Sequence, residues 1–124
     1  MVIDKSDNII QDLTFNFATR IVKFYRHLTE SRNVYVLSKQ ILRSGTSIGA
    51  NVRESIHASS SADFINKLTI SLKEADETLY WLELMHETEI INDTEFQSMS
   101  NDVKQIIGTL VKIIKAKKAS AKSF

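Results

Sequence analysis

The chain has 124 residues, of which 16 are basic and 15 acidic, and its formal net charge is +1 at pH 7. This length fits one domain spanning residues 1–124, and the near-neutral charge is far from the strongly basic balance of a dedicated nucleic-acid binder. The chain has no cysteine, which excludes disulfides, thiolate metal sites and a cysteine nucleophile.

Helical periodicity predicts the first two elements. The chain has no proline and only three glycines, so it lacks the turn-forming residues that separate the strands of an all-β protein. A helix is predicted over residues 7–29 and a second over residues 33–57, separated by a polar break. Their apolar side chains recur at steps of three and four: Ile10, Leu13, Phe17, Ile21, Phe24 and Leu28 in the first, and Leu37, Ile41, Ile48 and Val52 in the second.

Helical periodicity in the second half of the chain predicts two further helices, over residues 61–90 and 93–118. The apolar period stops near Ala116, so we expect the chain to fray beyond it. Four helices with short connections predict an all-α fold, an antiparallel up-down-up-down four-helix bundle. Two pairs resemble capping arrangements at helix starts: Ser60 with Asp63, and Asn92 with Glu95.

Several helices carry more apolar surface than one core face requires. Excess apolar surface on a small domain usually marks a contact surface, and symmetric self-association is its commonest form. We favour a subunit interface for the extra stripe of the first helix and for Tyr80 and Trp81 of the third. For the fourth helix, a widened core face is the better explanation. The extra stripe of the first helix contains Phe15, Ala18, Val22 and Tyr25.

The segment from residue 37 to residue 54 contains two glycines, Gly45 and Gly49, one turn apart on a predicted helix. Glycine inside a helix costs roughly 0.5 to 1 kcal/mol relative to alanine, so a close neighbour is expected there. The neighbour is either residues 68–79 of the third helix or a helix of another subunit. Asn51, near the same small-residue face, could hydrogen-bond to an adjacent backbone.

Catalytic and cofactor chemistry have little support in the sequence. Two Glu-x-x-His pairs, Glu54 with His57 and Glu83 with His86, resemble part of a di-metal bundle site. In an antiparallel pair of helices they lie on the order of 27 Å apart, so they cannot share a metal. No nucleophile arrangement or phosphate loop stands out. We expect no enzyme activity, no cofactor, no metal and no small-molecule substrate.

Membrane and secretory signals are also missing. Charged residues interrupt the apolar runs of the first thirty residues, and no segment approaches the roughly 20 apolar residues that cross a bilayer. We therefore expect a soluble, cytoplasmic protein with no membrane partner.

Charge is unevenly placed at the end of the chain. No acidic residue follows Asp102, whereas six lysines do. A solvated helix end that complements the helix dipole is the favoured interpretation, and an anion-binding surface is the alternative. The lysines are Lys104, Lys112, Lys115, Lys117, Lys118 and Lys122.

One motif is specific enough to indicate a family. The pattern Arg43-x-x-x-Ser47-Ile48-x-Ala50-Asn51-x-x-Glu54, followed by Asp63-Phe64 and the stretch 72–84, resembles the four-helix-bundle family of the 23S rRNA intervening-sequence protein. The resemblance extends from about Phe15 to Lys115. It implies a bacterial protein that assembles as a homopentamer. The family also resembles the accessory variability protein of diversity-generating retroelements, which works with a reverse transcriptase and binds nucleic acid through a basic surface.

Two functional hypotheses follow. The leading one is a non-enzymatic, homo-oligomeric bundle that acts as an RNA-binding or ribosome-associated accessory protein. The alternative is an adaptor that offers an aromatic flank, Tyr25 and Trp81, to a nucleic-acid-processing protein such as a reverse transcriptase. Within the motif, Arg43, Asn51 and Glu54 are expected to be structural, with Arg43 and Glu54 each meeting another helix or subunit, and Gly45 and Gly49 to set close packing. The candidate nucleic-acid-binding residues are Arg43, Arg53, Lys104, Lys112 and Lys115.

Overall fold

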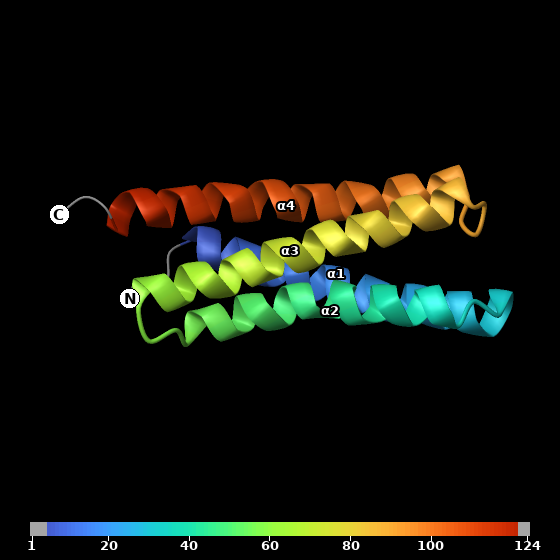
Figure 1. The fold of residues 1–124 in the computed structure, drawn as a ribbon, viewed down its shortest axis with the longest axis horizontal. Helices are drawn as coiled ribbons and strands as arrows, with labels where there is room; N and C mark the ends of the chain where they lie inside the picture. The colour runs from blue at the N-terminus through green and yellow to red at the C-terminus, as the bar shows by residue number, and fades with distance from the viewer. Residues whose placement is uncertain (1–4, 122–124) are drawn as a thin grey trace.

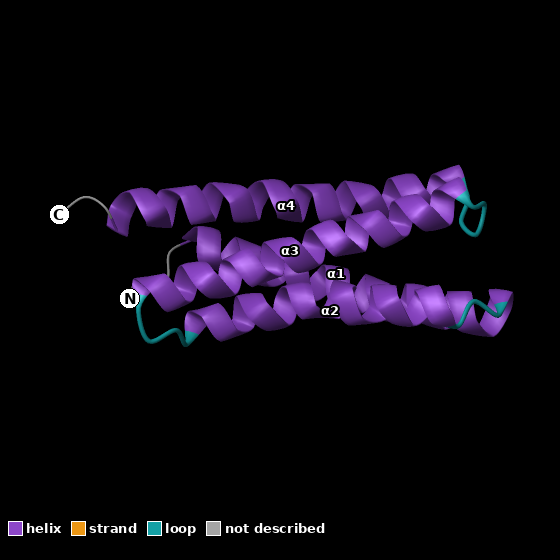
Figure 2. Cartoon of the chain, in the orientation of Figure 1, coloured by secondary structure: helices purple, strands orange, loops and turns teal. Residues whose placement is uncertain are grey.

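The computed structural model describes residues 5–121, and all of its regular structure is helical (Figure 2). The four helices are α1 (Lys5–Arg32), α2 (Val36–Ile56), α3 (Ser61–Glu87) and α4 (Asp93–Ala121). This confirms the all-α class and the number of helices. None of these helices is both long and apolar enough to span a membrane.

Each helix packs against two others. α1 contacts α2, α2 contacts α3, α3 contacts α4, and α4 returns to contact α1. The α2–α3 loop lies at one end of the molecule and the other two loops at the opposite end (Figure 1). The buried stripes of all four helices meet along the middle, and the largest fully buried side chains include Phe17, Ile21, Phe64, Leu82 and Leu110. The apolar stripes read from the sequence therefore form one core.

The α1–α2 boundary differs from the predicted one, because α1 continues to Arg32 and α2 starts only at Val36. Asn33 has a left-handed backbone with φ of 58°. The Val34 amide donates back to the Leu28 carbonyl at 2.9 Å. This bond spans seven residues, one more than the six-residue bond that commonly closes a helix C-terminus. Asparagine tolerates the left-handed conformation at this turn. Asn33 thus ends α1 and cannot begin α2.

The predicted end of the third helix at residue 90 is also wrong, because α3 stops at Glu87. Glu89 is left-handed with φ of 62°. The amides of Ile90 and Ile91 both point back to the Met85 carbonyl, at 2.8 and 3.3 Å. Ile91 becomes buried in the core. Residues 88–91 therefore form the turn between α3 and α4.

Both capping patterns are confirmed. The Ser60 hydroxyl accepts from the Asp63 amide at 3.0 Å. At the start of α4 the Asn92 side chain accepts from the Glu95 amide at 2.8 Å, and the Asn92 amide donates to the Glu95 carboxylate at 3.0 Å. Each arrangement satisfies amide groups that a helix N-terminus would otherwise leave unpaired.

The prediction that the chain frays beyond Ala116 is wrong, since α4 stays helical to Ala121. Lys117 explains why. Its ammonium lies 3.7 Å from the carboxylate of the buried Asp7 of α1 and 5.2 Å from the centre of the Phe64 ring of α3. Lysine is usually a solvent-exposed residue, but Lys117 points inward and joins the end of α4 to two other helices.

The close neighbour of the two α2 glycines is α1. Neither predicted neighbour, residues 68–79 of α3 or a helix of another subunit, therefore occupies this place. A Cβ atom on Gly45 would lie 2.7 Å from Cγ1 of Ile21, and one on Gly49 would lie 3.2 Å from the Thr14 carbonyl oxygen. α3 instead meets the adjacent side of α2. There Ser71 donates to the Ile48 carbonyl at 2.8 Å, and Thr78 donates to the Ser44 hydroxyl at 2.9 Å.

Candidate functional site

The polar residues of the motif hold α2 in place. The Arg43 guanidinium contacts two carboxylates of α3, Glu74 at 2.9 Å and Glu77. Glu54 lies 3.3 Å from the ammonium of Lys67, also on α3. The expectation that Arg43 and Glu54 each meet another helix is thereby confirmed. Arg43 already shares its charge between two acids, so it is poorly suited to bind a phosphate.

Asn51 stays within its own helix. Its side-chain amide donates to the Ser47 carbonyl at 2.8 Å, one turn earlier in α2. Carbonyls inside a helix already accept one backbone hydrogen bond, and this additional bond satisfies a half-buried amide without a second helix. The expected hydrogen bond to an adjacent backbone is therefore not the one formed, because the acceptor belongs to α2 itself.

Arg53 lies on the flank of α2 that faces α1, at the rim of an apolar groove between α1 and α2. The groove encloses about 390 Å³ and is walled by Thr14, Phe15, Ala18, Gly49 and Ala50, among others. The guanidinium carbon of Arg53 lies 6.0 Å from the centre of the Phe15 ring, at the outer limit of a cation–π contact. Arg43 and Arg53 therefore face different neighbours and do not form one basic surface.

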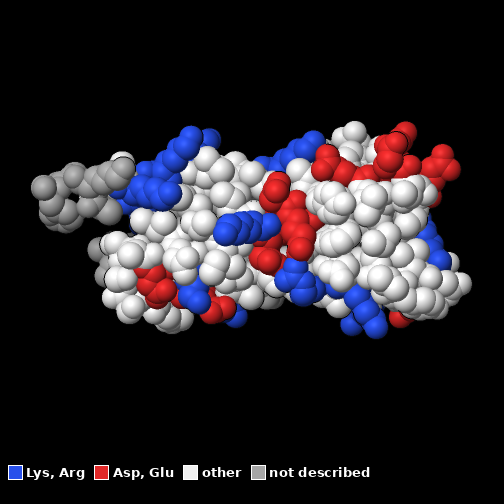
Figure 3. All heavy atoms as spheres, in the orientation of Figure 1, with Lys and Arg blue, Asp and Glu red and all other residues white. Residues whose placement is uncertain are grey.

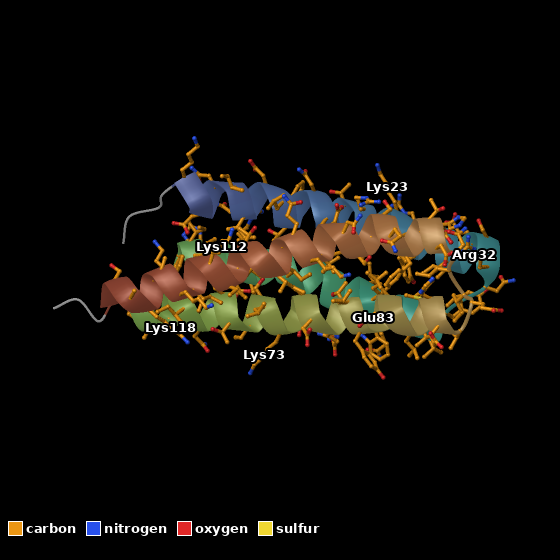
Figure 4. All side chains as sticks on the ribbon, turned by 90° about the horizontal axis from the view of Figure 1, so that it is seen from above. Lys23, Arg32, Lys73, Glu83, Lys112 and Lys118 are labelled. Carbon is orange, nitrogen blue, oxygen red and sulfur yellow. The ribbon has the colours of Figure 1, made fainter. Side chains whose placement is uncertain are left out.

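The three lysines predicted to bind nucleic acid, Lys104, Lys112 and Lys115, lie together on α4, and Lys118 lies on the same side of the helix. Lys104, Lys112, Lys115 and Lys118 are all exposed, and none of the four makes an ion pair with another residue of the described 5–121 segment. Lys112 and Lys118 lie on the two edges of the outer side of α4 (Figure 4). We call these four residues the lysine face.

Charge is unevenly distributed over the face of the molecule in Figure 3. Basic side chains gather over the C-terminal half of α4, and acidic ones gather in the middle of this face and near the α3–α4 loop (Figure 3). Because no acidic residue follows Asp102 in the sequence, the lysine face has no acid of its own helix beside it. The net charge of the whole chain is near zero, but the lysine face is a local basic surface that an anion can contact.

The exposed aromatic surface differs from the predicted pair. Tyr25 and Trp81 are half-buried, and Trp81 packs against the core. The exposed aromatic side chains include Phe15 and Tyr80, at 60% and 57% exposure. The Tyr80 and Trp81 rings meet edge to face with centres 5.2 Å apart. Periodicity placed all four on apolar flanks but did not separate the half-buried from the exposed.

The two Glu-x-x-His pairs lie apart, and within residues 5–121 no group of three or more histidine, aspartate or glutamate side chains is placed to hold a metal ion. His86 has a structural setting. Its Nε2 lies 2.6 Å from the Asp93 carboxylate, and its ring stacks on Phe96 with centres 4.3 Å apart. These contacts join the end of α3 to the start of α4.

Sequence reasoning missed a second polar cluster, between the end of α1 and the start of α4. The Arg32 guanidinium donates two hydrogen bonds to the Glu95 carboxylate, at 2.9 and 2.8 Å, and one to the Ile90 carbonyl at 2.9 Å. Burial acts to raise the pKa of Glu95. The hydrogen bonds from Arg32 and Asn92 and the charges of Arg32 and His27 outweigh burial and lower that pKa. No local pattern pairs residues 63 positions apart.

Comparison with known proteins identifies a family and similar solved structures. The family model described as 23S rRNA-intervening sequence protein matches residues 6–112. A crystal structure at 1.70 Å resolution, of a protein of unknown function from the S23 ribosomal protein family of Bacteroides thetaiotaomicron VPI-5482, is 54% identical. The match covers 89% of this chain and 98% of that one, with a TM-score of 0.88. No curated protein matches.

Proposed function

This chain belongs to the 23S rRNA-intervening sequence protein family, and we propose that it is a non-enzymatic, homo-oligomeric protein that binds RNA through the lysine face. In this proposal the helices form an up-down-up-down bundle, and five copies assemble into a ring. The pentamer rests on the resemblance to the family. The observation that supports RNA binding is the lysine face, a run of cations on one side of α4 that have no ion-pair partner among residues 5–121.

The lysine face suits a chain of phosphates better than a single small anion. From Lys104 to Lys118 it extends about 21 Å along the helix at 1.5 Å per residue. Exposed lysines that bind phosphates release condensed counterions, which gives affinity without base recognition and makes it steeply dependent on salt. An oligomer repeats the face in every copy. The proposed binding is therefore electrostatic and independent of sequence.

Removing the lysine face should abolish most of this binding. A Lys104→Gln, Lys112→Gln, Lys115→Gln triple variant is expected to lose about tenfold or more in affinity for single-stranded RNA, and to lower the slope of log K against log salt by about 2, since each phosphate contact contributes roughly 0.7. Filter binding across a salt series measures both quantities.

The matched control is a Lys23→Gln, Lys39→Gln, Lys73→Gln triple variant. These lysines are exposed on α1, α2 and α3, so the control removes the same charge from other surfaces. It should bind RNA nearly as the wild type does. Equal losses in the two triple variants would show that only net charge matters, and absence of RNA retention by the wild type at low salt would overturn the proposal.

Self-association is the second part of the proposal, and the groove beside Phe15 supports it. Phe15 is 60% exposed next to an apolar groove, so a Phe15→Ser variant should fold with unchanged helicity and lose oligomer mass. Light scattering tests this, because five copies of the 14.1 kDa chain have a mass of about 70 kDa. A wild-type protein that is monomeric at micromolar concentration would contradict the proposal.

The same exposed aromatic residues favour one alternative function, an adaptor for a nucleic-acid-processing protein such as a reverse transcriptase. Phe15 and Tyr80 are the exposed aromatics in this alternative, because Tyr25 and Trp81 are half-buried. An adaptor predicts that Phe15→Ser leaves the oligomer mass unchanged and abolishes capture of the partner. A homo-oligomer interface predicts the opposite pair of results.

A further inference from the structure

Gly108 is the glycine that the packing of this chain does not explain. Gly45 and Gly49 each face a close neighbour on α1. A Cβ atom added to Gly108 would meet no heavy atom of the described residues within 4 Å. No glycine between residues 5 and 121 has a positive φ, so the conformation does not require glycine at 108 either. A glycine in the middle of a helix lowers helix stability, and no contact with residues 5–121 compensates for it here.

Gly108 lies at the centre of the outer side of α4. It follows Lys104 by four residues and precedes Lys112 by four, so the three positions lie in one row along the helix. The two lysines are about 12 Å apart along the axis. The absence of a side chain between them leaves the helix backbone bare, with a cation on either side. Lys112 lies at the edge of this surface that faces α1 (Figure 4).

The flanking residues define what can approach the bare backbone. Close packing of a second helix on a glycine needs small residues one turn away, as in small-xxx-small pairs. Here the residues one turn away on both sides are lysines. An apolar helix seated on Gly108 would bury their charges without partners, which is costly. The occupant has to be narrow and to carry negative charge at intervals along its length.

We propose that a single-stranded nucleic acid lays its phosphate backbone across Gly108, in van der Waals contact with α4, with Lys104 and Lys112 paired to phosphates on either side. This inference rests on the proposed RNA-binding function and adds a point of closest approach to it. The missing side chain of Gly108 lets the phosphate backbone approach the helix closely, and the lysines supply the positive charge that binds the phosphates. The two contributions are separable by experiment.

The test is a leucine at this position. A Gly108→Leu variant should bind a fluorescent single-stranded oligouridylate about tenfold more weakly than the wild type, while the slope of log K against log salt stays the same because every lysine is retained. A Gly108→Ala variant should show a smaller loss in the same direction. Fluorescence anisotropy over a salt series gives both values. The thermal midpoint of either variant should be equal to or above that of the wild type, because both residues favour helix more than glycine does.

The matched control is Gln40→Leu, which adds similar bulk at an exposed position of α2, a helix that does not contact α4. Its binding should equal that of the wild type. If the wild type and the lysine variants behave as proposed but Gly108→Leu binds normally, this inference is overturned and the RNA-binding function stands. If the wild type binds no oligouridylate, the proposed function fails with it. If Gly108→Leu instead loses binding to polyglutamate or loses oligomer mass, the occupant is an acidic protein surface and the inference is again wrong.

Discussion

Replacing Gly45 by leucine should lower the free energy of unfolding by about 3 kcal/mol, the upper end of the cost of overpacking a core. Even the first added carbon would lie 2.7 Å from Cγ1 of Ile21. Ile21 is fully buried, so its side chain has no route to solvent. The α1 and α2 helices would have to move apart along their contact. Such a loss is a large share of the 5–15 kcal/mol that holds a typical domain together.

A double-mutant cycle separates overpacking from other effects of the substitution. Ile21→Ala alone should cost about 2–5 kcal/mol because it leaves a cavity. In the Gly45→Leu, Ile21→Ala double variant the leucine occupies that cavity, so the combined cost should fall below the sum of the two single costs by more than about 1 kcal/mol. Urea unfolding followed by circular dichroism, at one protein concentration, measures each corner of the cycle.

Gly108→Ala is the control for this cycle. The same type of residue is replaced in the interior of a helix, but the added carbon meets no atom within 4 Å. This variant should gain about 0.5 to 1 kcal/mol of stability from helix propensity alone. Additive costs for Gly45→Leu and Ile21→Ala, or a loss of stability in Gly108→Ala, would contradict the assignment of Gly45 to the α1 contact.

The glycines also show how far the sequence predicts this fold. Their spacing on a helical stripe indicated close packing, and close packing is present. Periodicity identifies the face of a helix, however, and not the helix that covers it. Gly45 and Ser44 are neighbours in sequence yet face α1 and α3 respectively. The partner is determined by the arrangement of all four helices, which no single segment encodes.

The candidate site could also be predicted only in part, because the sequence of one helix does not show which residues of the neighbouring helices contact it. The excess of lysine after Asp102 was visible in the sequence, and four of those side chains form the lysine face. Which lysine turns inward was not visible, because Lys117 is held by Asp7 and Phe64 from the two neighbouring helices. Arg43 is a comparable case. Its charge suggested a phosphate contact, and its carboxylate partners lie 31 and 34 residues further along the chain.

The Arg32–Glu95 pair makes the stability of the bundle depend on pH. Burial raises the pKa of Glu95, but the hydrogen bonds and charges of its partners outweigh burial and lower that pKa in the folded protein. A carboxyl with a lowered pKa stabilises the fold fully above its ordinary pKa, and that contribution is lost as the pH falls through the folded-state value. The pair joins the last turn of α1 to the first turn of α4, beside the α3–α4 loop (Figure 4).

A Glu95→Gln variant isolates this contribution. Glutamine keeps the shape of the side chain and removes the charge that Arg32 binds, so the variant should be less stable than the wild type by about 1–2 kcal/mol at about pH 7. As the pH falls through the lowered folded-state pKa of Glu95, the wild-type carboxyl takes up a proton, and the difference between the two proteins should shrink towards zero. Urea unfolding at about pH 7 and at an acidic pH gives the comparison. Glu83→Gln is the control, since Glu83 is exposed and should show little difference at either pH. A stability difference for Glu95→Gln that stays constant or grows on acidification would mean that Glu95 acts as a helix cap alone, without the charge of Arg32.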